Sequence, residues 1–368
     1  MDGRARATGA AGRRTGTALR EVKVAHLSDL HLGYAGAGPG RAGDVLRAFE
    51  SALARIAELG PDLVVVAGDV FDHPEVTAPP IATFSRAVRK LRDSLPEVVV
   101  AVAAGLRDIP LEAGARGPIM VIGALPGVEV ATTTVRRLGL YGGQLSVTLL
   151  PHPAVMVSRS LSVSPDPAAK WNVLVAHAAL ASGRSHAPAV ARRGWDYVAL
   201  GSRHVYTPVA ERACYCGSLE RVGTDPWEES AIDKGFVTAQ LESGEVTFWP
   251  VEARAAVSLA PIEATGGGTA TVARRLGEAL AGVPGGIDGK LLRVPVRGLS
   301  DEDLAALDRE VLAGVRRRVA ELRVDALPGQ GASHGVGGAG AWREVAAAGE
   351  RSSRAGGRAR VGVRAVGR

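Results

Sequence analysis

The feature that most constrains the fold is a regular alternation of short apolar runs with longer amphipathic stretches. The apolar runs cover residues 22–27, 63–67, 98–103, 145–150, 173–176 and 197–200, and the apolar spacing of a helix covers 45–59 and 81–95. Runs that are apolar at nearly every position are typical of strands buried on both faces. The alternation predicts an α/β domain with helices packed against sheets. Residues 236–241 and 246–249 predict a closing hairpin.

The pattern changes after residue 255. A Gly/Thr-rich linker is followed by a helical stretch at 272–280 and a strand-like run at 291–296. A chain of 368 residues has room for one large domain and one smaller one. We therefore expect a large domain over residues 21–255 and a small α+β domain over 256–327, with tails at 1–20 and 328–368.

The two tails carry the excess positive charge of the chain. The net charge is +6, and Arg residues are concentrated in residues 1–20 and in the Gly/Ala-rich C-terminal segment. Neither tail has the apolar periodicity of a folded segment. We interpret the tails as disordered, solvated ends. The alternative is that they add a loose, salt-sensitive affinity for phosphate backbones.

The apolar runs are too short for membrane spans, which need roughly 18 residues, so we expect neither export nor membrane insertion. The only cysteines, Cys214 and Cys216, stand two apart in one short apolar run, and we expect no bridge between them. Both observations favour a reducing, cytoplasmic setting.

Polar residues with metal-ligand chemistry stand where four of the apolar runs end. The first run ends in SDLH at 28–31 and the second in GD at 68–69, while later runs end at His177 and in GSRH at 201–204. Ligands of α/β folds bind at the carboxyl ends of strands, so these side chains should converge on one edge. Carboxylates and imidazoles together suit Mn, Fe or Zn. The order of the motifs therefore predicts a metal site.

The chain resembles the calcineurin-like metallophosphoesterases and, among them, the SbcD-type DNA repair exonuclease subunits. The resemblance rests on HLSDLHLG at 26–33, GDVFD at 68–72, GSLER at 217–221 and KGF at 234–236, and it covers residues 22–255. It implies a four-layer α/β sandwich, with two mixed sheets between helices and residues 256–327 as a small capping domain. It also implies a phosphodiesterase that acts on DNA, a divalent metal, expected to be manganese, and an SbcC-like, SMC-type ATPase as partner.

The resemblance also implies roles for individual residues. A first metal would be held by Asp29, His31 and His204, the bridging carboxylate would be Asp69, and His177 would bind a second metal. Asp72 either orients the ligand loop or caps its turn. Two metals would polarise the phosphodiester, activate water and stabilise both the attacking and the leaving oxygen.

The catalytic centre departs from the family pattern at three positions. Where the family has Gly-Asn-His-Asp, this chain has Gly-Leu-Arg-Asp at 105–108, and where the family has Gly-His-x-His, this chain has Gly-Ser-Arg-His at 201–204. The catalytic positions are therefore held by Arg107 and Asp108. Leu106 has no donor atom, and Ser202 is a weak ligand. Arg107 cannot release a proton, although it can stabilise phosphate charge.

Counting donors predicts one complete site, formed by Asp29, His31, Asp69 and His204, and a weak second site with only Asp69 and His177. Activity should be low, because a missing general acid alone costs about 10²- to 10⁴-fold in rate.

Two alternatives to this function stay open. The chain could be a non-catalytic member that binds DNA or a partner with one metal, or a small-molecule phosphoesterase, against which residues 217–221 and the capping domain argue. The Gly/Arg-rich sequence after residue 327 argues against the ATPase partnership.

Overall fold

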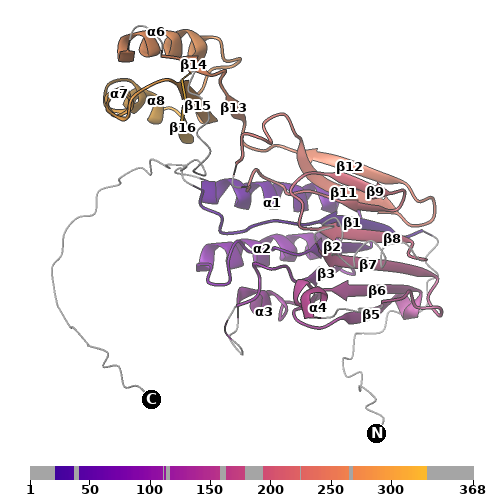
Figure 1. Ribbon diagram of the computed structural model, residues 1–368. Helices are drawn as coiled ribbons and strands as arrows, with labels where there is room; N and C mark the ends of the chain where they lie inside the picture. Colours follow the sequence, from indigo (N-terminus) through magenta and orange to yellow (C-terminus); the bar gives the residue numbers. More distant parts are fainter. Residues whose placement is uncertain are drawn as a thin grey trace, which may run out of the picture.

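The computed structural model describes residues 21–36, 41–110, 112, 117–157, 163–178, 194–223, 225–264 and 268–329. Apart from residues 328 and 329, the tails lie outside these ranges, so their predicted disorder stays a prediction. Figure 1 shows two sheets stacked with helices and a smaller unit beside α1.

The first sheet has six strands in the order β12-β11-β1-β2-β3-β4. Their bounds are β1 Lys23–Leu27, β2 Leu63–Ala67, β3 Val99–Ala103, β4 Val128–Ala131, β11 Lys234–Gln240 and β12 Val246–Val251. The strands β1 to β4 run parallel, whereas β11 is antiparallel to both β1 and β12. The sheet is therefore mixed, and β11 with β12 forms the predicted hairpin.

The second sheet also has six strands, in the order β5-β6-β7-β8-β10-β9. Their bounds are β5 Arg136–Leu140, β6 Leu145–Leu150, β7 Trp171–His177, β8 Tyr197–Gly201, β9 Thr207–Ala210 and β10 Ala213–Tyr215. The four inner strands pair in parallel, and the edge strands β5 and β9 pair antiparallel. The short η1 helix, Tyr141–Gly143, connects β5 to β6.

Apolar layers hold the two sheets and their helices together. The helices α1 (Arg41–Leu59) and α2 (Ala78–Ser94) cover the outer face of the first sheet, where Phe49 and Phe84 stack with ring centroids 5.5 Å apart. Between the sheets, side chains such as Val65 and Val175 form a second core. The far face of the second sheet packs against α4 (His152–Val157), and α3 (Pro118–Ile122) is a further described helix of this domain. The predicted fold class, two mixed sheets flanked by helices, is confirmed.

The smaller unit has its own sheet and core. Its strands are β13 Ala256–Ser258, β14 Ile262–Glu263, β15 Leu291–Arg297 and β16 Glu321–Leu327, and its helices are α6 Gly268–Ala281, α7 Asp301–Leu307, the π-helix η2 Asp308–Leu312 and α8 Ala313–Arg316. Each other strand pairs in parallel with β15, and Val272, Leu276 and Val294 lie in the core. The domain boundaries and the capping role stay proposals. None of the described helices is long and apolar enough to cross a membrane.

A buried group of charges joins the smaller unit to α1. Arg41, which is fully buried, pairs with Asp44 at 2.8 Å and lies 3.9 Å from Glu321 of β16. Asp44 also accepts two hydrogen bonds from the guanidinium of Arg254, whose own backbone N–H binds the Glu220 carboxylate at 2.8 Å. Arg254 also donates a hydrogen bond to the backbone oxygen of Gly289 in the smaller unit. This bond and the contact between Arg41 and Glu321 join the two units.

A buried histidine at the contact between the two sheets makes the stability of the folded protein depend on pH. On β1, Nδ1 of His26 lies 2.9 Å from the hydroxyl of Tyr197 on β8, and the imidazole is fully buried. Burial lowers the pKa of His26 from 6.5 to about 3, although a backbone hydrogen bond with Leu200 opposes the shift. The folded protein therefore keeps this imidazole neutral while the unfolded chain binds a proton. The stability that results is present above about pH 6.5 and is lost as the pH falls toward 3.

We predict that His26→Gln, which cannot be protonated, removes this part of the pH dependence. The free energy of unfolding of the unaltered chain should fall by up to about 2 kcal/mol more than that of the variant between pH 7.5 and pH 5. Urea denaturation at both pH values measures the difference. Equal losses in the two proteins would show that His26 does not couple folding to pH.

Candidate metal centre

The carboxyl ends of β1, β2, β7 and β8 meet at one place, where the two sheets touch. The ring of His177, the last residue of β7, donates a hydrogen bond from Nδ1 to the carbonyl oxygen of Ala67 on β2, at 2.8 Å. This contact needs glycine on both sides. A Cβ on Gly68 would lie 2.3 Å from His177 Nδ1, and a Cβ on Gly201 would lie 1.7 Å from the Ala67 oxygen.

Four residues at this edge have a left-handed backbone, which is uncommon outside glycine. Asp29, His31 and Asp69 have φ of 50°, 45° and 48°, and Ser202 has φ of 105°. Such conformations cost about 1–3 kcal/mol each and gather at functional sites, where the surrounding structure enforces them. The sharp turns after β1, β2 and β8 therefore aim side chains into a common space at some cost in stability.

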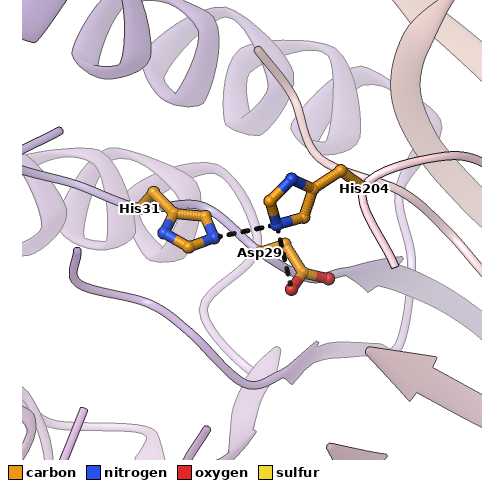
Figure 2. A group of neighbouring side chains, drawn as sticks. All are labelled: Asp29, His31 and His204. Atoms are coloured by element: carbon orange, nitrogen blue, oxygen red, sulfur yellow. Dashed lines mark hydrogen bonds and ion pairs between the residues drawn. The ribbon is translucent and has the colours of Figure 1, made fainter. Parts of the chain in front are cut away.

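The first cluster consists of Asp29, His31 and His204 (Figure 2). The Nε2 atoms of the two histidines lie 3.3 Å apart, and Nε2 of His204 lies 4.0 Å from Oδ1 of Asp29. Two ligands of one metal are about 3.0–3.4 Å apart when their bonds are about 2.1 Å long. The 3.3 Å between the two nitrogens falls within this range, so both can bind one metal ion.

Hydrogen bonds orient the ligand atoms of this cluster. His31 donates from Nδ1 to the Asp72 carboxylate at 2.9 Å, which leaves the Nε2 lone pair toward His204. The His31 bond and charge outweigh the effect of burial and hold the pKa of Asp72 below its ordinary value. Asp72 therefore orients the ligand loop, the first of its two interpretations.

The two carboxylate oxygens of Asp29 have different surroundings. Its Oδ2 accepts hydrogen bonds from the Ser28 hydroxyl at 2.6 Å and the Ser202 backbone N–H at 3.0 Å. Its Oδ1 is buried and has no hydrogen-bond partner among the described residues. An unpaired buried carboxylate oxygen is costly, and a cation at this position would satisfy it.

The second cluster consists of Asp29, Asp69 and His177. Oδ1 of Asp69 lies 3.6 Å from Nε2 of His177 and accepts the backbone N–H of Arg107 at 2.9 Å. Asp29 is thus the carboxylate common to both clusters, whereas the bridging role of Asp69 stays a prediction.

The electrostatics of the edge suit a divalent cation. Burial is the largest influence on His204 and lowers its pKa to about 4, against the opposing charge of Asp29, so this imidazole is neutral at neutral pH. Burial also acts on His177, but the charges of Asp69 and Asp29 outweigh it and raise the pKa. The carboxylates therefore create a field that attracts positive charge, and neutral imidazole with carboxylate is a donor set for Mn, Fe or Zn.

The loop at 105–108 carries two of the three departures from the family pattern. Leu106 is 58% exposed and brings no donor to the site. The half-exposed guanidinium of Arg107 donates to the Asp72 backbone oxygen at 3.1 Å. The third departure, Ser202, places a buried hydroxyl oxygen at the edge with no hydrogen-bond partner among the described residues.

Asp108 lies beneath this loop and is fully buried. Its two carboxylate oxygens accept the backbone N–H groups of Phe71 at 2.9 Å and Gly105 at 2.8 Å. Burial and the charge of Asp69 raise its pKa to about 6. In this position Asp108 holds the loops after β2 and β3 together, and a catalytic role for it stays a prediction.

The structure brings two residues to the site to which the sequence assigned no role there, His152 and Lys234 of the KGF motif. His152, the second residue after the end of β6, has its ring centroid 5.9 Å from that of His177. Applying the strand-end rule to residues 145–150 would have found it. The buried ammonium of Lys234 donates to the backbone oxygen of His204 at 2.8 Å and so fixes the turn that carries this ligand. That contact had no local signal in the sequence.

Two mixed sheets whose carboxyl edges gather aspartate and histidine around two clusters define a metallophosphoesterase. Residues 22–206, just over half of the chain, match the model of the calcineurin-like phosphoesterase family, and the chain belongs to this family. The resemblance drawn from the motifs is confirmed at this level.

Two similar proteins are DNA double-strand break repair proteins named Mre11. The one from Methanopyrus kandleri is 29% identical over 280 residues, which cover 67% of this chain and 60% of the relative. The one from Aeropyrum pernix is 35% identical over 89 residues, or 24% of this chain and 21% of the relative. The chain thus spans about 60% of the length of the Methanopyrus kandleri relative. These relatives support the DNA repair branch of the family.

We predict that the chain binds about one Mn²⁺ tightly, through the first cluster. Asp29→Ala or His204→Ala should abolish that binding, and Asp72→Asn should weaken it about 10–100-fold, because an outer hydrogen bond orients the ligand. Calorimetric titration of metal-free protein measures both effects. His73→Ala is the control, since this neighbouring side chain is exposed and pairs with Glu75. Tight binding by Asp29→Ala would contradict the assignment.

Proposed function

We propose that the chain is a divalent-metal-dependent phosphodiesterase that cleaves DNA, of the double-strand break repair type, and that its rate is reduced. The observation that carries the proposal is the pair of donor clusters that share Asp29 at the carboxyl edge of both sheets. The names of the two relatives support DNA as the substrate. Manganese is the proposed metal, because the donors are a mixture of carboxylates and imidazoles.

The bound metal would supply Lewis-acid polarisation of the phosphodiester and activation of water. The chain's own groups do the rest. Asp29, His31 and His204 hold the cation, and Asp72 keeps the His31 ring in the tautomer that presents Nε2. The exposed part of the Arg107 guanidinium can pair with phosphate oxygens. It cannot protonate a leaving group, so that proton has to come from water, which lowers the rate.

The second candidate is a non-catalytic member that binds DNA or a partner and retains one metal. The observation in its favour is Leu106, an exposed apolar side chain at a position that carries a ligand in the family. Binding of an SbcC-like ATPase and a cytoplasmic location stay predictions, since the segment after residue 329 is outside the described residues. DNA cleavage by the purified chain with Mn²⁺, lost in Asp69→Asn, distinguishes the two candidates.

We predict that the triple change Leu106→Asn, Arg107→His and Ser202→His raises Mn²⁺-dependent hydrolysis of bis-p-nitrophenyl phosphate or DNA by at least about 10²-fold, the scale of a regained general acid. Single changes should gain little, because the groups act as a unit. The exposure of Leu106 means that asparagine there meets no apolar core. Initial rates at saturating Mn²⁺ measure the gain.

The control replaces Met120, an apolar side chain of similar exposure at 51%, with asparagine, and should leave the rate unchanged. An unaltered chain that already cleaves as fast as the triple variant would show that the centre is not impaired.

A further inference from the structure

The segment directly after β10, residues 216–218, lies between the two turns that carry ligands of the first cluster. On one side, the backbone N–H of Ser218 donates to the carbonyl oxygen of His204 at 3.1 Å. On the other side, Sγ of Cys216 lies 3.1 Å from the hydroxyl oxygen of Ser28, the residue that precedes the carboxylate ligand. One short segment therefore contacts the surroundings of two metal ligands.

The Cys216 thiol begins a chain of hydrogen bonds that ends on the Asp29 carboxylate. The thiol donates to Oγ of Ser28 at 3.1 Å, and the Ser28 hydroxyl donates to Oδ2 of Asp29 at 2.6 Å. A hydroxyl can accept one hydrogen bond while it donates another, so both bonds exist together. The backbone N–H of Ser202 donates to the same Oδ2 at 3.0 Å. These two donors fix the carboxylate, whose Oδ1 stays without a hydrogen-bond partner among the described residues.

The Ser28 hydroxyl has a second acceptor within reach, and the thiol opposes its use. The backbone oxygen of Gly217 lies 3.3 Å from Oγ of Ser28 and 3.3 Å from Sγ of Cys216. Ser28 has a single hydroxyl proton, so donation to Gly217 would end its bond to Asp29. When the thiol donates to the Gly217 oxygen, it occupies the competing acceptor. When it donates to Oγ, it strengthens the bond that Ser28 donates in turn. Both arrangements favour the bond to Asp29.

The thiol of Cys216 is a permanent donor. The side chain is fully buried, and burial raises the pKa of the thiol well above its ordinary value, so it keeps its proton at neutral pH. Cys214, two residues earlier, is also buried, but its Sγ lies 3.3 Å from the hydroxyl of Tyr197. That hydroxyl contacts His26, which is not a ligand of either cluster. The two thiols therefore have similar burial but different connections.

We propose that Cys216 is a positioning residue for the metal ligand Asp29 and acts through the hydroxyl of Ser28. The Ser28 bond sets the rotation of the carboxylate, so that Oδ1 faces the cluster, and the thiol keeps the Ser28 hydroxyl in that bond. This inference rests on the proposed function, since it concerns how tightly the first cluster holds its cation.

The test is the affinity of the full chain for Mn²⁺, measured by electron paramagnetic resonance of the free ion during titration. Ser28→Ala should weaken the tight site about 10–100-fold, because a partner that orients a ligand is lost. Cys216→Ala should weaken it about 3–10-fold, the effect of one ordinary hydrogen bond, whereas Cys216→Ser keeps a donor and should stay within about 2-fold of the unaltered chain. Cys214→Ala is the matched control on a buried thiol and should leave the affinity unchanged.

A double change shows whether Cys216 acts through Ser28. In the Ser28→Ala background, Cys216→Ala should cause no further loss of affinity, whereas independent effects of the two residues would add. Additive losses, or equal affinities of Cys216→Ala and Cys214→Ala, overturn the inference and leave the first cluster as proposed. No Mn²⁺ binding by the unaltered chain overturns the proposed function instead. If Cys216→Ala does not fold, as judged by its thermal unfolding, Cys216→Val fills the space without a donor and decides by the same comparison.

Discussion

The hydrogen bond between the His177 ring and the Ala67 carbonyl, 2.8 Å long, is the contact on which the site depends. It joins the carboxyl ends of strands from two different sheets, and it also orients the His177 ring so that Nε2 faces the Asp69 carboxylate at 3.6 Å. Such a close approach is possible because Gly68 and Gly201 present no side chains to it. A methyl group on either glycine would push the sheets apart where the donors must converge.

Around this contact, backbone N–H groups donate hydrogen bonds to the carboxylates of the site. Asp108 is satisfied by two amides, Asp69 by the amide of Arg107, and one oxygen of Asp29 by the amide of Ser202. The substitutions at 106, 107 and 202 change side chains but keep these amides. The positions of the carboxylates therefore depend on backbone amides and not on the side chains at 106, 107 and 202. This explains how the geometry of the site is kept although these side chains differ from the family pattern.

The central elements could be predicted from the sequence because their patterns are strong. The runs at 63–67 and 98–103 are apolar throughout and form β2 and β3, and the amphipathic stretches at 45–59 and 81–95 form most of α1 and α2. The edge strands β4, β5 and β9 were not predicted, whereas the edge strand β12 was, as part of the hairpin. β5 contains Arg136 and Arg137, and β9 has an exposed burial pattern, so neither has the continuous apolar character of a buried strand.

The strength of the local pattern also explains which site residues could be predicted from the sequence. Asp29, Asp69, His177 and His204 each follow a strongly apolar run, so the strand-end rule indicated them. His152 also follows such a run, but the intervening Pro151 gave its segment the character of a loop. The fixing of His204 by Lys234 depends on a contact across 30 residues, which no local pattern reveals.

The buried charges between α1 and the smaller unit have a consequence for how the protein melts. Separating the two units would remove the Glu321 carboxylate from the buried guanidinium of Arg41 and the Gly289 oxygen from the guanidinium of Arg254. A buried charge that loses a partner costs free energy. Two bodies with separate apolar cores can lose structure one after the other. Here the first to loosen would destabilise its neighbour, so heating should give one calorimetric transition spanning both cores.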